Sequence, residues 1–202
     1  MSDVEATHRL GRAALSAPGR TPWVSRPRLL ELIRTGSDTW QPELVLVSGP
    51  AGAGKSVLAR QWLETDGREH LAISVTPELD DPSALTRALV ESLEGVGPSA
   101  RNLRASINSA EPRLSTIVVP GLRRFAAARS HSYVLVIDDV HLLRNPACAM
   151  VLHAVCDGTP DGGQGLRLSR GEAPVGRGRA RDEGRLREIT AADLRFDAGE
   201  AA

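Results

Sequence analysis

Continuous runs of apolar residues indicate where this chain forms strands. Leu44–Ser48 and Tyr133–Ile137 are almost wholly apolar, and Leu71–Val75 is a third run of the same kind. The first run stops at Gly49, a residue typical of turns. Short runs without polar alternation are typical of strands buried on both faces, as in a parallel sheet.

Between these runs, apolar residues recur at helical spacing. Leu29, Leu30 and Ile33 follow the capping sequence Ser25-Arg26-Pro27, which predicts a short helix that ends near Gly36. Further helices are predicted from Lys55, from Asp81-Pro82 to Gly95, from Pro112 to Arg129 with a break at Pro120-Gly121, and from Asn145-Pro146 to about Val155. The alternation predicts an α/β fold in three layers, a parallel sheet with helices on both faces.

Composition bounds the class of protein. The chain has 202 residues, 41% hydrophobic but 3% aromatic, so its core must be mainly aliphatic. A formal net charge of zero argues against a nucleic-acid-binding surface. Polar residues 1–20 predict a flexible N-terminal arm before one domain at 21–202. The start resembles no signal peptide, and no apolar run approaches the roughly 20 residues of a membrane-spanning helix, so we expect a cytoplasmic protein without membrane contact.

The segment GPAGAGKS fits the phosphate-loop pattern G-x-x-x-x-G-K-[ST] and lies between a predicted strand and a predicted helix. Glycines let such a loop turn its N–H groups toward bound phosphates, and the following helix adds its positive amino end. The loop therefore predicts a nucleotide site. Its predicted binding residues are Gly49, Pro50, Ala51, Gly52, Ala53, Gly54, Lys55 and Ser56.

Lys55 is the only lysine among the 25 basic residues, and all the others are arginine. A compact, flexible ammonium can reach the β- and γ-phosphates inside the loop, where the broad planar guanidinium of arginine does not fit. Retention of one lysine at this position therefore favours a phosphate-binding role. The hydroxyl of Ser56 is predicted to bind Mg²⁺.

Two acids follow the second long apolar run. Asp138, at the strand end, is predicted to hold Mg²⁺ together with Ser56, directly or through water. Asp139 is placed to polarise an attacking water, so the acid pair favours hydrolysis over simple transfer. His141 has two interpretations, a sensor of the phosphate state or a structural residue of a strand–helix loop.

Together, GPAGAGKS, LVIDDVHLL and REITAADLRF make the chain resemble the nucleotide-binding domain of the MalT-like signal-transduction ATPases. These are P-loop NTPases of the STAND class, found in large bacterial regulators that often end in a LuxR-type domain. The resemblance runs from about Thr21 to the end and implies a P-loop NTPase fold. It implies that Val24 and Arg26 lie near the adenine and ribose, whereas the alternative is that both belong to an ordinary helix cap.

The resemblance also implies a strand between the phosphate-loop strand and the Asp138 strand. The candidate is Gly165–Arg170, with Ser169 and Arg170 at its tip and Arg170 reporting the γ-phosphate. Only Leu166 and Leu168 are apolar in it, whereas a buried central strand is usually apolar throughout. We therefore expect this fourth strand to be weak or damaged, either because sequence is lost within 158–182 or because the strand is intrinsically poor.

These features predict an ATP-binding switch module of a bacterial transcriptional regulator, which binds Mg-ATP and hydrolyses it slowly to ADP. The family continues beyond the point matching Ala202 into a lid and a winged helix, so the expected partners are further regulator domains or other copies of the chain. No DNA-binding motif and no guanine-reading N/TKxD motif are visible. The alternatives are a small P-loop phosphotransferase, with the arginine-rich 177–187 as its lid, and a non-functional truncated remnant.

Overall fold

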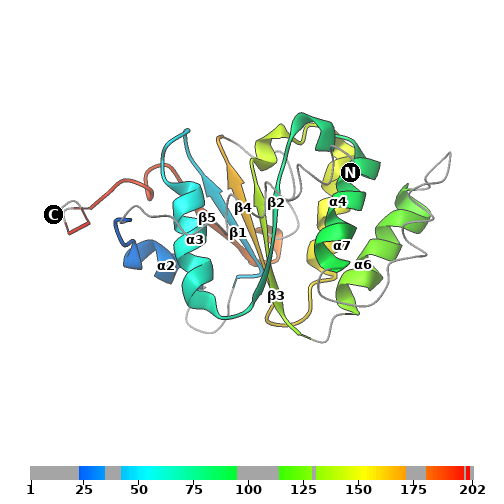
Figure 1. The fold of residues 1–202 in the computed structure, drawn as a ribbon, viewed down its shortest axis with the longest axis horizontal. Helices are drawn as coiled ribbons and strands as arrows, with labels where there is room; N and C mark the ends of the chain where they lie inside the picture. The colour runs from blue at the N-terminus through cyan, green and yellow to red at the C-terminus, as the bar shows by residue number, and fades with distance from the viewer. Residues whose placement is uncertain are drawn as a thin grey trace.

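Within the described part of the chain, five strands form one sheet in the order β2-β3-β4-β1-β5, and each of their pairings is parallel (Figure 1). This computed structural model describes residues 23–34, 42–94, 114–128, 131–171, 181–197 and 199–200. The strands are β1 (Leu44–Ser48), β2 (Glu69–Ser74), β3 (Tyr133–Asp138), β4 (Gln164–Ser169) and β5 (Leu186–Ile189). The parallel sheet that the apolar runs predicted is therefore present, and β1 has the predicted bounds.

Helices cover both faces of this sheet (Figure 1). On one face lie α2 (Pro27–Arg34) and α3 (Lys55–Asp66). On the other lie α4 (Pro82–Glu94), α6 (Val119–Ala127) and α7 (Pro146–Asp157). The fold is thus the three-layer α/β sandwich predicted from the sequence.

Successive residues of the central strands face opposite helical layers, since side chains alternate along a strand. In β1, Val45 and Val47 pack with α2 and α3 in a cluster around the fully buried Trp62. Leu46 points to the other face and packs with α4, α6 and α7. Burial on both faces is why these strands are continuous apolar runs instead of alternating ones.

The expectation of a weak or damaged fourth strand is wrong. β4 is a complete central strand, paired in register with β1 and β3, and all of its residues are buried. Its polar side chains have partners. The Gln164 amide donates to the carbonyl oxygen of Ile33 at 3.1 Å, and the Arg167 guanidinium, 1% exposed, lies 3.0 Å from the Cys156 sulfur of α7. Tertiary contacts thus let this strand tolerate residues that look unfavourable in the sequence.

The helix predicted over 112–129 with a break is observed in its described part, 114–128, as two pieces. A π-helical turn at Leu114–Val118 leads into α6, in which Pro120 lies in the first turn. Proline is tolerated there because the N–H groups of a first turn have no partner within the helix. The predicted arm at 1–20 and the helix ends near Gly36 and Gly95 lie outside the described residues.

Among the described residues, no helix is long and apolar enough to cross a membrane.

The start of α7 offers a clean test of helix capping. The side chain of Asn145 accepts a hydrogen bond from the Ala147 N–H at 3.0 Å, as the Asn-Pro sequence predicted. We expect Asn145→Ala to destabilise the fold by about 1 kcal/mol, because this N–H loses its acceptor. Asn145→Ser keeps an acceptor and should cost far less. Urea unfolding of the two variants measures the difference, and equal midpoints would contradict the capping role.

Candidate nucleotide site

The carboxyl ends of the central strands β3, β4 and β1 lie at one edge of the sheet. The residues predicted to bind phosphate and Mg²⁺ lie at these strand ends or shortly after them. The segment after β1 is tied to the end of β4, because the N–H of Gly49 donates to the carbonyl oxygen of Ser169 at 3.1 Å. In open α/β sheets, ligands bind outside the carboxyl ends of the strands. This edge is therefore where a ligand site is expected.

The loop between β1 and α3 has the backbone that its glycines were predicted to allow. Gly52 and Gly54 have φ values of 78° and 83°, in the left-handed region that favours glycine. A methyl group added at either position would have no atom within 4 Å, so these two glycines serve backbone conformation, not packing. Gly54 precedes the first turn of α3 without a side-chain cap, which leaves the amino end of this helix facing the loop.

Lys55 points back into this loop. Its ammonium donates to the carbonyl oxygens of Gly49 at 2.7 Å and Pro50 at 2.8 Å, and the side chain is largely buried. Burial lowers the pKa of Lys55, whereas the charges of Asp138 and Asp139 act in the opposite direction. The loop thus holds a desolvated cation at its centre, where a phosphate oxygen could replace the carbonyl contacts.

Ser56 and Asp138 meet at the same edge although they lie on different elements. The Ser56 hydroxyl donates to Oδ2 of Asp138 at 2.8 Å, and the N–H of Asp139 donates to Oδ1 at 2.8 Å. Burial raises the pKa of Asp138, and the two hydrogen bonds partly oppose this rise. The structure therefore brings together the two residues predicted to bind Mg²⁺.

This hydroxyl–carboxylate pair fits the known preferences of Mg²⁺. The ion takes oxygen ligands and is usually held by one or two protein groups together with water and substrate phosphates. The described residues contain no group of three or more histidines, cysteines or acids that could hold a metal without such help. Ser56 and Asp138 would thus suit a magnesium ion that arrives with a nucleotide better than a resident metal.

Asp139 and Arg170 are joined directly, which the sequence did not predict. Arg170, just after β4, places its Nε 3.1 Å from Oδ1 of Asp139, and Nδ1 of His141 lies 3.7 Å from the same oxygen. Asp139 has a φ of 55°, the only positive value at a non-glycine residue in the described chain. Such backbone strain is often found at functional sites, where the surroundings maintain it.

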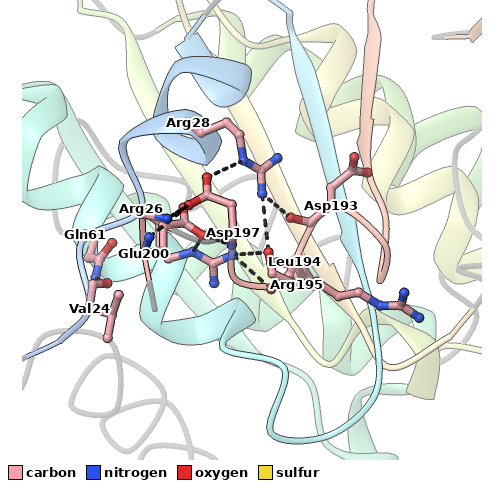
Figure 2. Close-up of polar contacts among 10 residues, drawn as sticks. Val24, Arg26, Arg28, Gln61, Asp193, Leu194, Arg195, Asp197 and Glu200 are labelled. Atoms are coloured by element: carbon pink, nitrogen blue, oxygen red, sulfur yellow. Dashed lines mark hydrogen bonds and ion pairs between the residues drawn. The ribbon is translucent and has the colours of Figure 1, made fainter. Parts of the chain in front are cut away.

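Val24 and Arg26 do not contact the phosphate loop through hydrogen bonds in the described structure. The Val24 side chain is exposed, and its carbonyl oxygen accepts from the Gln61 amide of α3 at 2.8 Å. The Arg26 guanidinium faces residues 190–197 and Glu200, here called the C-terminal segment. It donates hydrogen bonds to the carbonyl oxygens of Leu194 and Arg195 (Figure 2). Their predicted proximity to adenine and ribose stays a prediction.

The C-terminal segment also reaches the phosphate loop, a contact that the sequence analysis missed. A methyl group added at Gly49 would lie 2.8 Å from Cδ1 of Leu194 and 3.6 Å from Cα of Ala191. A side chain at position 49 would therefore need the end of Leu194 to shift, so the C-terminal segment packs closely on the first glycine of the loop. The motif REITAADLRF contributes to the family resemblance, but no local pattern in it indicates what it contacts.

Comparisons with known proteins identify the family of the chain. Residues 23–166 match the family model described as AAA ATPase domain. The curated relatives include the serine/threonine-protein kinase PknK of Mycobacterium tuberculosis (strain H37Rv) and of Mycobacterium bovis, each 33% identical over 188 residues. The match covers 89% of this chain but 16% of those proteins, so the chain spans about a sixth of their length.

Solved structures that are similar to the chain include PCH-2 of C. elegans, with a TM-score of 0.39 and 15% identity over 93% of this chain and 41% of that one. AMPPCP-bound DnaA from Aquifex aeolicus has a TM-score of 0.42 and 16% identity over 97% of this chain and 48% of that one. Because both TM-scores are below 0.5, neither likeness supports an argument about this chain. The family match covers most of the described domain, and on that basis the chain belongs to the AAA ATPase domain family.

Proposed function

We propose that this chain is the ATP-binding switch module of a larger bacterial transcriptional regulator, and that it binds Mg-ATP and hydrolyses it slowly. The observation that carries the proposal is the convergence of Lys55, Ser56 and Asp138 at one sheet edge, next to a loop of suitable backbone. Membership of the AAA ATPase domain family supports nucleotide binding independently.

In this proposal, each residue of the loop has a separate task. The N–H groups of the loop and of the first turn of α3 bind phosphate oxygens, and Lys55 exchanges its bonds with Gly49 and Pro50 for bonds with the β- and γ-phosphates. Ser56 and Asp138 hold the magnesium ion, which neutralises phosphate charge when it is bound. By the resemblance, Val24 and Arg26 would lie near the adenine and ribose.

Hydrolysis would use the second pair of residues. Asp139 orients a water molecule toward the γ-phosphate, and Arg170 contacts the developing charge. Without nucleotide these two side chains bind each other at 3.1 Å, so Arg170 must leave Asp139 when it turns to a γ-phosphate. Arg170 would thus bind Asp139 in one state and the γ-phosphate in the other. Because ADP lacks the γ-phosphate, ATP and ADP would favour different conformations.

The lengths of the relatives support a switch more than a self-sufficient enzyme. A domain that spans about a sixth of a PknK chain shares its polypeptide with much further sequence, to which it could transmit its nucleotide state. We propose that the partners of this domain are such regulator domains, or other copies of the chain, in the cytoplasm. The alternative of a small phosphotransferase is separated from this proposal by its need for an acceptor.

The first test concerns Lys55. Lys55→Ala should abolish measurable Mg-ATP binding in isothermal titration, because no other ammonium can occupy the loop, while the unfolding transition remains cooperative. Lys55→Arg is the sharper variant, since it keeps the charge and should also lose binding if the compact shape of the ammonium matters. Wild-type affinity in both variants would refute the nucleotide site.

The second test exploits the raised pKa of Asp138. Because the folded protein holds this proton to higher pH than the unfolded chain, its stability falls as pH rises from the ordinary value of 3.8 through the raised pKa. Asp138→Asn has no carboxyl to ionise at this position, so it should melt at a higher temperature than wild type near neutral pH.

The same variant should lose the magnesium dependence of ATP binding, since a neutral amide is a poorer ligand for the ion. Asp161→Asn, at an exposed position after α7, is the matched control and should change neither property. A variant at position 138 that melts at or below the wild-type temperature and still binds Mg-ATP would contradict the assignment.

The third test separates hydrolysis from transfer. Purified chain incubated with Mg-ATP alone should release inorganic phosphate, because the attacking group is water. Asp139→Asn should slow this release by about a hundredfold, the size expected when a positioned proton acceptor is removed, with little change in ATP affinity. Release that appears only when an acceptor is added would favour the phosphotransferase.

A further inference from the structure

Arg26 is a buried residue at the centre of a cluster of contacts that joins the start of α2 to the C-terminal segment (Figure 2). Arg26 is 5% exposed. Its Nη2 donates to the carbonyl oxygens of Leu194 at 2.9 Å and Arg195 at 3.1 Å. Nε lies 3.0 Å from a carboxylate oxygen of Glu200, and the ring of Phe196 lies 4.3 Å from Cζ. This one side chain therefore has contacts along most of the segment.

Burial makes these contacts energetically important. The side chains of Arg26 and Glu200 are both 6% exposed, so each charge has lost most of its water and depends on the other. When one member of a buried pair is removed, the remaining charge is left uncompensated, which costs far more than loss of a surface ion pair. Arg28 contacts the same segment from the solvent side, through Asp193 and Asp197, and its exposed pair should contribute little.

The segment that Arg26 binds consists of two local turns. In the first, the Asp193 carboxylate accepts from both the N–H and the hydroxyl of Thr190, at 2.8 and 2.7 Å, and these bonds lower the pKa of Asp193. In the second, Glu200 accepts from the N–H of Asp197 at 3.1 Å while Asp197 accepts from the N–H of Glu200 at 2.9 Å. This reciprocal pattern is that of a helix capping box.

Arg26 binds the backbone at the junction of these turns, Leu194 and Arg195. The first turn also packs on the phosphate loop, since Cδ1 of Leu194 would lie only 2.8 Å from a methyl group added at Gly49. The carbonyl oxygen of Gly49 accepts from the ammonium of Lys55 at 2.7 Å. A continuous series of contacts therefore leads from Arg26 through Leu194 and Gly49 to the lysine predicted to bind phosphate.

We infer that Arg26 is a positioning residue, which fastens residues 190–197 together with Glu200 against the first glycine of the phosphate loop and thereby holds the loop in its binding conformation. This effect runs through Leu194 and does not require a contact between Arg26 and the nucleotide. Its effect on the loop can be measured without any ligand, whereas its effect on ATP affinity rests on the proposed function.

The experiment compares Arg26→Gln with wild type by amide hydrogen exchange in the absence of nucleotide, followed by titration with Mg-ATP. We expect exchange to rise about tenfold both in residues 191–197 and in residues 49–56, because loss of the guanidinium opens the segment and the loop together. The dissociation constant for Mg-ATP should rise by a similar factor. Arg34→Gln is the matched control, because Arg34 is exposed at the end of α2, the helix that follows Arg26. It should change neither the exchange rates nor the dissociation constant.

Glu200→Gln is the second variant, and it tests the positioning role of Arg26 if Arg26→Gln does not fold. It keeps the bonds from Arg26 to the backbone but removes the compensating charge, so both regions should exchange faster, by a smaller factor. Faster exchange in 191–197 with an unchanged loop, in whichever variant folds, would overturn the inference and leave Arg26 as a local tie.

The two proposals fail in distinguishable ways. If wild type and Arg34→Gln do not bind Mg-ATP at all, the proposed function fails, while loop exchange without ligand still decides the role of Arg26. If wild type binds and Arg26→Gln binds equally well with a loop of unchanged exchange, the proposed function stands and the positioning role is refuted.

Discussion

The pairing of β4 between β3 and β1 is the constraint on which the site depends. It sets the ends of three strands side by side, so that the loop after β1, the acids after β3 and Arg170 after β4 reach one another. The bond from the Gly49 N–H to Ser169, and the ion pair between Asp139 and Arg170, both follow from this order.

A second theme is that the buried charges of this edge are compensated locally by polar groups of the protein. Lys55 is held by loop carbonyls, Asp138 by a hydroxyl and an N–H, and Arg26 by two carbonyls and a carboxylate. The first two arrangements consist of groups that a phosphate and a metal ion can replace. The cluster of Arg26 is more enclosed and is better suited to a permanent contact than to an exchanging one.

Much of the fold was predictable because its signals are local. β1 and the start of α3 have the predicted bounds, since a buried strand and a phosphate-loop helix each leave a clear pattern in adjacent residues. β4 was misjudged because its suitability depends on partners distant in sequence, Ile33 for Gln164 and Cys156 for Arg167. The Asp139–Arg170 pair was missed for the same reason, as a pairing across strands is not written in the residues of either one.

The sequence by itself determined the chemistry of the site: one lysine in a glycine-rich loop, a serine beside it and two acids at the end of an apolar strand. These are properties of residue type and spacing, and they need no knowledge of how distant segments meet. The tertiary structure decided which groups share a contact, above all that Arg26 binds Leu194, Arg195 and Glu200, and that Leu194 packs on Gly49. Such contacts join residues far apart in the chain, so they are determined by the packing of the sheet and its helices and leave no trace in local sequence.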